Sequence, residues 1–377
     1  MPKKLLFFFG TRPEAIKMAP LIREFQKYPK AFDVKVCVSA QHREMLDQVL
    51  AFFDILPDFD LNIMKANQNL FDITTLALNR IREVVLSYLP DWLFVQGDTT
   101  TTFAGALAAF YEKVKVAHIE AGLRSFNRYS PFPEETNRVL TTHLSELHFP
   151  PTKTARNNLL HEGVPEDKVF VVGNTSIDAL HLCLKIMKEK RPPQMQLLRK
   201  VDFRKKVILV TGHRRESFGK PFENICRALK AIASRNNVEV VYPVHLNPNV
   251  RKPVFNILRA VPNVHLVEPL NYPSFVWLMN QSHIILTDSG GVQEEAPSLG
   301  KPVLVMRDVT ERVEGIEAGT AVLVGTSTDR IIGETTRLLD NRAEYNRISK
   351  AVNPYGDGKA SQRIVRVLRA RFRGHHT

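Results

Sequence analysis

Short apolar runs alternate with segments of helical periodicity along this 377-residue chain, and this alternation constrains the fold more than any other feature. The runs span residues 5–9, 34–38, 92–95, 114–119, 207–211, 238–242, 264–267 and 284–287. Strands that alternate with helices in this way predict parallel, doubly wound sheets. Since the pattern occurs twice, we expect an α/β protein with two Rossmann-like domains that face each other across a cleft.

A linker region over residues 171–206, which contains a Pro-Pro pair, separates the two repeats of this pattern. We expect an N-terminal domain over residues 1–172 and a C-terminal domain over residues 173–360, each with its own core. Residues 361–377 carry several arginines with apolar residues at helical spacing between them. They are predicted to form a basic helix or tail that packs back on the N-terminal domain.

The composition restricts the cellular setting and the partners. A formal net charge of +13 indicates an anionic partner, either a polyanion or a small phosphorylated substrate. Cys37, Cys183 and Cys226 are odd in number and far apart, which is typical of reduced thiols in a cytoplasmic protein and offers no metal-ligand spacing. No apolar run approaches the roughly 18 residues that span a bilayer, so no membrane association is expected.

Acidic residues follow two consecutive strands of the first repeat. Asp98 comes directly after the 92–95 run, and Glu120 comes directly after the 114–119 run. Because ligands bind off the carboxyl ends of parallel strands, both carboxylates are expected to face one crevice. Glu134 begins a later helix, and the three acids suit acid/base chemistry. Helix capping is the competing explanation for an acid at a strand end.

Cationic and glycine-rich loops follow strands of the second repeat. The segment 207–217, VILVTGHRRES, delivers His213 and two arginines after an apolar run. In DSGGVQEEA, the backbone N–H groups of Ser289, Gly290 and Gly291 could cradle a phosphate, unless Ser289 is simply a helix N-cap. Glu295 lies one turn further and could accept hydrogen bonds from ribose hydroxyls.

Several cationic side chains that follow strands could together bind a nucleoside diphosphate, although each one separately could be an ordinary surface charge. They are Arg12, Lys17, His213 and Arg312. Neither GxGxxG nor GxxxxGK[ST] occurs, which argues against a Rossmann dinucleotide site and a P-loop, so no cofactor and no metal are expected.

Signature-like segments occur along nearly the whole chain. They are GTRPEAIKMAP, AQHREMLDQVL, GDTTTT, HIEAGLRS, PFPEETNR, GNTSIDAL, TGHRRESFG, YPVHLNPNVR, LTDSGGVQEEAPSLGKPVLVMRD and NPYGDG. In this order they resemble the non-hydrolysing bacterial UDP-N-acetylglucosamine 2-epimerases. The resemblance implies a GT-B-like fold, a homodimer, and interconversion of UDP-GlcNAc and UDP-ManNAc that feeds surface polysaccharide synthesis.

The resemblance also implies roles for individual residues. The positions that match nucleotide-binding residues are Arg12, Lys17, His213, Phe275, Ser289, Gly290, Gly291, Glu295 and Arg312. The positions that match catalytic residues are Asp98, Glu120, Glu134 and His213.

Some relatives of this kind are activated by a second UDP-GlcNAc, bound by glutamines and an arginine. Of the matching positions, Gln41, His42 and Gln68 are retained, whereas Glu44 and Asn67 stand where those relatives carry glutamine and arginine. Val313 replaces a proline that usually follows the arginine matched by Arg312.

The reaction itself restricts the mechanism. Hydrogen on carbon 2 of a sugar nucleotide is not next to a carbonyl, so inversion requires oxidation of a neighbour or departure of the anomeric group. Without a recognisable NAD motif, departure of UDP through a 2-acetamidoglucal intermediate is favoured, with Asp98 as the first choice for proton transfer at carbon 2. The alternatives are a hydrolysing 2-epimerase, a GT-B glycosyltransferase and, from net charge alone, a basic nucleotide- or nucleic-acid-binding protein.

Overall fold

The computed structural model of the chain describes residues 1–40, 43–65, 68–190 and 194–373 and divides it into two compact units. The first unit comprises Met1–Leu182 together with Tyr355–Thr377, and the second comprises Cys183–Pro354. The division falls inside one uninterrupted helix, α7 (Thr175–Met187), whereas the sequence placed a domain boundary before that helix. The chain also returns to the first unit earlier than residue 361.

The first unit contains a six-stranded parallel sheet in the order β3-β2-β1-β4-β5-β6. Its strands are β1 (Lys3–Phe9), β2 (Phe32–Val38), β3 (Phe59–Asp60), β4 (Trp92–Gln96), β5 (Lys115–Ile119) and β6 (Leu147–Phe149). Its helices are α1 (Arg12–Gln26), α2 (Arg43–Phe52), α3 (Leu70–Tyr88), α4 (Thr100–Tyr111), α5 (Glu134–Leu144), α6 (Lys153–His161) and α15 (Ala360–Arg373).

The second unit contains a six-stranded parallel sheet in the order β12-β11-β10-β7-β8-β9. The strands are β7 (Lys206–Thr211), β8 (Val238–Pro243), β9 (Val264–Val267), β10 (Ile284–Thr287), β11 (Val303–Val305) and β12 (Ala321–Leu323). The helices are α8 (Lys220–Ala233), α9 (Pro248–Leu258), α10 (Tyr272–Gln281), α11 (Gly290–Glu295), α12 (Val313–Glu317), α13 (Thr328–Asp340) and α14 (Arg342–Ser349). The two parallel α/β sheets predicted from the sequence are therefore confirmed.

The central strands are buried on both faces, which explains their nearly continuous apolar sequences. Residues 5–9 of β1 are fully buried, and Phe7 stacks on Phe94 of β4 with ring centroids 4.6 Å apart. Phe25 of α1 meets both rings at steep angles, the geometry that aromatic pairs prefer. This rigid centre holds the carboxyl ends of β1 and β4 in place.

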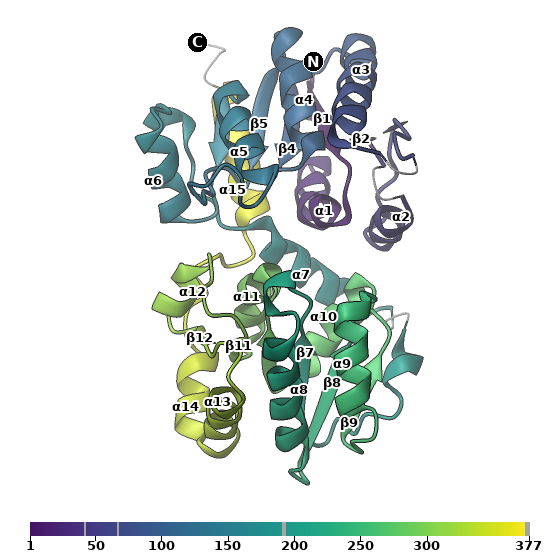
Figure 1. Cartoon of the computed structure of the whole chain (residues 1–377). Helices are drawn as coiled ribbons and strands as arrows, with labels where there is room; N and C mark the ends of the chain where they lie inside the picture. The colour runs from purple at the N-terminus through teal and green to yellow at the C-terminus, as the bar shows by residue number, and fades with distance from the viewer. Residues whose placement is uncertain (41–42, 66–67, 191–193, 374–377) are drawn as a thin grey trace. The chain divides into compact units, whose positions relative to one another are not determined.

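The helix α15, yellow in Figure 1, belongs to the first unit and packs against α1. Arg369 lies over the ring of Tyr28, 4.4 Å from its centroid, and Phe372 contacts Phe32 with centroids 6.0 Å apart. The carboxylate of Asp178 accepts hydrogen bonds from the first backbone N–H groups of α15. Within the described residues, no helix is both long enough and apolar enough to cross a membrane.

Candidate active site

In the first sheet the strand order reverses between β1 and β4, and the loops after β1, β4 and β5 emerge at the same carboxyl edge. Such a reversal is where open α/β sheets bind ligands. Arg12 is the first residue of α1, Asp98 follows β4 and Glu120 follows β5. Glu134 is the first residue of α5, the helix after the β5 loop.

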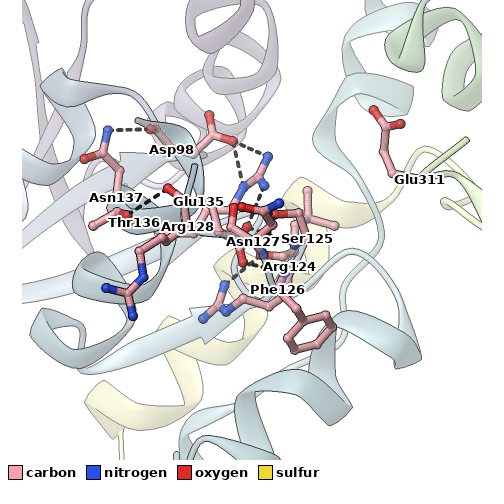
Figure 2. Close-up of polar contacts among 12 residues, drawn as sticks. Asp98, Arg124, Ser125, Phe126, Asn127, Arg128, Glu135, Thr136, Asn137 and Glu311 are labelled. Atoms are coloured by element: carbon pink, nitrogen blue, oxygen red, sulfur yellow. Dashed lines mark hydrogen bonds and ion pairs between the residues drawn. The ribbon is translucent and has the colours of Figure 1, made fainter. Parts of the chain in front are cut away.

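Asp98 is held by the helix α5. Its carboxylate oxygen Oδ2 accepts a hydrogen bond from Arg138 Nε at 2.8 Å and forms an ion pair with Nη2 at 2.6 Å. Its backbone carbonyl accepts another hydrogen bond, from Asn137 Nδ2 at 2.9 Å, as Figure 2 shows. These contacts anchor Asp98. Its side chain is still 26% exposed and therefore remains accessible to solvent.

Glu120 forms an ion pair with Lys17 of α1, with 2.5 Å between Oε2 and Nζ. The side chain of Glu120 is 9% exposed, so the pair is largely removed from solvent. The backbone of Glu120 has φ +63°, a left-handed conformation that costs a non-glycine residue about 1 kcal/mol or more. Such strain at a polar residue on a sheet edge is typical of functional sites.

Glu134 lies at the start of α5 with its Oε2 buried and, among the described residues, without a hydrogen-bond partner. Burial of an unpaired carboxylate oxygen costs free energy. A hydrogen-bond donor on a bound ligand would remove that cost. Such an unpaired oxygen is expected of a residue that contacts the substrate.

Glu14 is a buried residue that sequence reasoning missed. Its Oε2 accepts from the N–H and hydroxyl of Thr11 at 2.8 and 2.7 Å, and its Oε1 accepts from the hydroxyl of Thr99 at 2.8 Å. Burial raises the pKa of Glu14, and the hydrogen bonds from Thr11 and Thr99 oppose that rise. It therefore joins the loop before Arg12 to the loop after Asp98. The capping pattern Thr-x-x-Glu over residues 11–14 was the signal that could have found it.

In the second unit, β7 and β10 are neighbours, and the loops after them meet at Asp288. The buried Asp288 accepts hydrogen bonds through Oδ2 from the backbone N–H groups of His213 at 2.6 Å and Arg214 at 2.8 Å. Its Oδ1 lies 3.4 Å from His213 Nδ1. Sequence reasoning assigned no role to Asp288, although it follows a buried strand.

The imidazole of His213 is 42% exposed and stacks on His245 with ring centroids 5.3 Å apart. Burial lowers the pKa of His213; Asp288 opposes this effect, while His245 and Arg214 add to it. The ring therefore favours its neutral form. A neutral ring with Nδ1 toward Asp288 can use Nε2 toward a ligand.

The glycine pair after β10 begins the short helix α11, with Ser289 at the N-cap position. A Cβ atom on Gly290 would lie 2.9 Å from Cζ of Arg312, so glycine lets the guanidinium approach the backbone here without a shift. Arg312 Nε donates to the buried Glu294 at 2.9 Å, which fixes the guanidinium beside Gly290. Gly291 is exposed.

The remaining predicted residues occupy separate places. Phe275 lies in α10 and Glu295 ends α11, both half-buried. Gln68 Nε2 donates to the carbonyl of Ile63 at 2.6 Å. Gln41 and His42 lie outside the described residues, so the second UDP-GlcNAc site stays a prediction.

Two parallel sheets with charged loops at their carboxyl edges define a GT-B-like α/β enzyme. A glycosyltransferase of kitacinnamycin shares this fold, with a TM-score of 0.64 at 14% identity, over 97% of this chain and 99% of that chain. The family model described as UDP-N-acetylglucosamine 2-epimerase matches residues 23–369. The chain belongs to the UDP-N-acetylglucosamine 2-epimerase family.

Individual relatives are similar over their full length. The UDP-N-acetylglucosamine 2-epimerase of Salmonella typhimurium is 56% identical over 371 residues, 97% of this chain and 98% of the relative. The crystal structure of UDP-GlcNAc 2-epimerase from Neisseria meningitidis bound to UDP-GlcNAc has a TM-score of 0.88 at 53% identity. That match covers 97% of this chain and 100% of the Neisseria chain.

Proposed function

We propose that this chain interconverts UDP-GlcNAc and UDP-ManNAc without hydrolysis. The observation that carries the proposal is the grouping of acids with distinct environments at the carboxyl edge of one sheet. Asp98 is anchored by an arginine, Glu120 by a lysine, and Glu134 keeps a buried oxygen that has no partner among the described residues. Membership of the 2-epimerase family supports the same assignment.

The chemistry proceeds by elimination and re-addition. The bond between carbon 1 and the diphosphate oxygen breaks, UDP leaves with the electron pair, and a carboxylate removes the proton from carbon 2. The double bond of 2-acetamidoglucal forms between these carbons. A proton then adds to carbon 2 from the opposite face, and UDP returns to carbon 1.

The residues divide this work according to their surroundings. Asp98 transfers the proton at carbon 2, while Glu120 and Glu134 share the second proton transfer and stabilise developing positive charge. Asp98 and Glu134 are both positioned by α5, whereas Glu120 follows β5 and pairs with Lys17 of α1.

The leaving diphosphate needs positive charge and N–H donors. We assign these to Arg12, His213, Arg312 and the backbone amides of residues 289–291. Glu295 would accept from the ribose hydroxyls, and Phe275 completes the nucleotide site. No step uses an added cofactor or metal in this scheme.

Proton and phosphorus NMR in heavy water tests the proposal directly, with UDP-GlcNAc as the only added substrate. Intact UDP-ManNAc deuterated at carbon 2 is the expected product. Free ManNAc with UDP would assign the chain to the hydrolysing class. An unchanged spectrum would favour a glycosyltransferase that needs an acceptor.

We also propose that the chain forms a homodimer through the C-terminal ends of α3 and α4. Leu86, Leu89, Phe110 and Tyr111 are all exposed there, and the ion pair between Arg82 and Glu112 joins the two helix ends at 2.8 Å. An exposed apolar cluster of this kind marks an interaction surface.

We further propose a cytoplasmic location, which the buried, unpaired cysteines support. A role in surface polysaccharide synthesis would follow from the proposed product.

A further inference from the structure

The first turn of α5 contains more than one acid. Glu134 is a predicted catalytic residue, but its neighbour Glu135 is buried and points elsewhere. Glu135 accepts hydrogen bonds from the backbone N–H groups of Ser125 at 2.9 Å and Phe126 at 3.0 Å. Figure 2 shows Glu135 close to this loop, while the ring of Phe126 extends away from it. Glu135 thus attaches the loop after β5 to α5.

The same carboxylate also orients an arginine one turn further along the helix. Arg138 Nη1 donates to Glu135 Oε2 at 3.0 Å, while its Nε and Nη2 contact Asp98. Arg138 is 16% exposed and therefore bridges two carboxylates in a largely water-excluded position. Burial raises the pKa of Glu135, but the hydrogen bonds from Ser125, Phe126 and Arg138 outweigh burial and hold this pKa below its ordinary value.

The bridge is asymmetric at Asp98. Within the described residues, both contacts from Arg138 fall on Oδ2, and Oδ1 has no hydrogen-bond partner. Asn137 fixes the backbone of Asp98 from the same helix. One carboxylate oxygen is therefore immobilised and the other is left available.

We propose that Arg138, oriented by Glu135, is a positioning residue that binds Oδ2 of Asp98 and thereby presents Oδ1 for proton transfer at carbon 2 of the substrate. This inference rests on the proposed function. A guanidinium suits the role because its planar donors define a direction, whereas a lysine supplies only a point charge. Because α5 also begins with Glu134, one helix sets the relative positions of two reacting acids.

The charged groups around Asp98 come from several elements. Arg138 and Glu135 approach from α5, and Glu14 of α1 reaches the adjacent Thr99. His118 Nε2 of β5 donates to the carbonyl of Gly97, and burial lowers the pKa of His118 to about 4. His118 is therefore neutral near pH 7. Among the described residues, Arg138 is the cation that contacts the Asp98 carboxylate, so its removal would leave that carboxylate free to turn.

The test compares Arg138→Gln and Arg138→Lys with the wild type, with kcat, KM and the isotope effect of deuterium at carbon 2 of UDP-GlcNAc measured for each. For Arg138→Gln we expect kcat to fall about 100-fold, because a misplaced acid costs about that much. We expect the isotope effect to rise above the wild-type value, because slower proton transfer then limits the rate. KM should change less than about threefold, because binding is not the step affected.

The lysine variant separates charge from direction. Arg138→Lys keeps the cation but not its planar donors, so kcat should still fall about tenfold. Glu135→Gln should lower kcat as well, because Arg138 loses the carboxylate that orients it. Arg156→Gln removes an arginine paired with the exposed Glu166 and serves as the matched control with wild-type kinetics.

The outcomes are distinguishable. A wild type that makes no UDP-ManNAc would refute the proposed function itself. An active wild type with an Arg138→Gln variant whose kcat falls while the isotope effect stays at the wild-type value would show a merely structural role. Unchanged kcat in both Arg138 variants would overturn the inference as well. If Arg138→Gln does not fold, the Arg138→Lys result decides, since unchanged kcat there excludes directional positioning.

Discussion

Carboxylates of two kinds lie at the carboxyl edge of the first sheet. Glu14 and Glu135 use both of their oxygens to accept hydrogen bonds that hold loops together. Asp98 and Glu134 each keep an oxygen without a partner among the described residues. This difference separates structural acids from acids that can react, because an oxygen occupied by backbone donors cannot approach a substrate proton.

The assignment of Asp98 leads to a first prediction. Asp98→Asn should lower deuterium incorporation at carbon 2 by roughly 10²–10⁴-fold, since the amide cannot take up the proton. Mass spectrometry of the product made in heavy water measures this. The exposed Asp329→Asn serves as a control and should incorporate deuterium at the wild-type rate. Full incorporation by Asp98→Asn would remove Asp98 from the proton-transfer step.

A second prediction concerns pH and the loop that carries Arg312. Burial opposes ionisation of Glu311, but the guanidinium groups of Arg312 and Arg307 outweigh burial and lower its pKa from 4.5 to about 2. Because the folded pKa is the lower one, the stability that Glu311 contributes is present above pH 4.5 and is lost as pH falls toward 2.

Glu311→Gln should therefore lower the Tm near neutral pH, and the difference from the wild type should shrink as pH falls below 4.5. Thermal unfolding at pH 7 and at pH 3 measures the two differences. An equal Tm difference at both pH values would show that the ionised form of Glu311 does not stabilise the loop.

At the scale of elements, strand order decides which loops lie next to one another. β4 and β5 are consecutive and adjacent, so Asp98 and Glu120 emerge at the same edge, as parallel strands require. Long central strands were predictable because their apolar runs are continuous. The strands β6, β11 and β12 were not, because three residues are too few to show a period and their pairing partners lie elsewhere in the chain.

The helix α15 offers a third prediction. Asp178 accepts hydrogen bonds from the N–H groups of Ala360 at 3.1 Å and Ser361 at 2.8 Å, in a buried position. Asp178→Ala leaves these donors unpaired and should lower the free energy of unfolding by about 2–3 kcal/mol, as measured by urea denaturation.

A control for this prediction lies at the same helix end. Asp357 pairs with Arg363 at 2.7 Å, but its side chain is 51% exposed. Because exposed ion pairs contribute little, Asp357→Ala should cost less than about 1 kcal/mol. Equal losses for the two variants would mean that the buried hydrogen bonds of Asp178 do not anchor α15.

At the scale of the whole molecule, a fourth prediction concerns assembly. Leu89→Asp combined with Phe110→Asp places two charges in the exposed apolar cluster of α3 and α4, and should convert the proposed dimer into a monomer. Size-exclusion chromatography with light scattering gives the mass. Leu56→Asp, at an exposed residue outside this cluster, should stay dimeric. A monomeric wild type at micromolar concentration would contradict the proposal.

The sequence by itself determined the two parallel sheets and which polar residues end up at their carboxyl edges, because strand runs and the residues after them are local properties of the chain. Only the tertiary structure decided the partners: Arg138 for Asp98, Lys17 for Glu120, and Asp288 for the turn at His213. These pairs join residues far apart in the chain. Their proximity depends on strand order and helix placement, which no local pattern encodes.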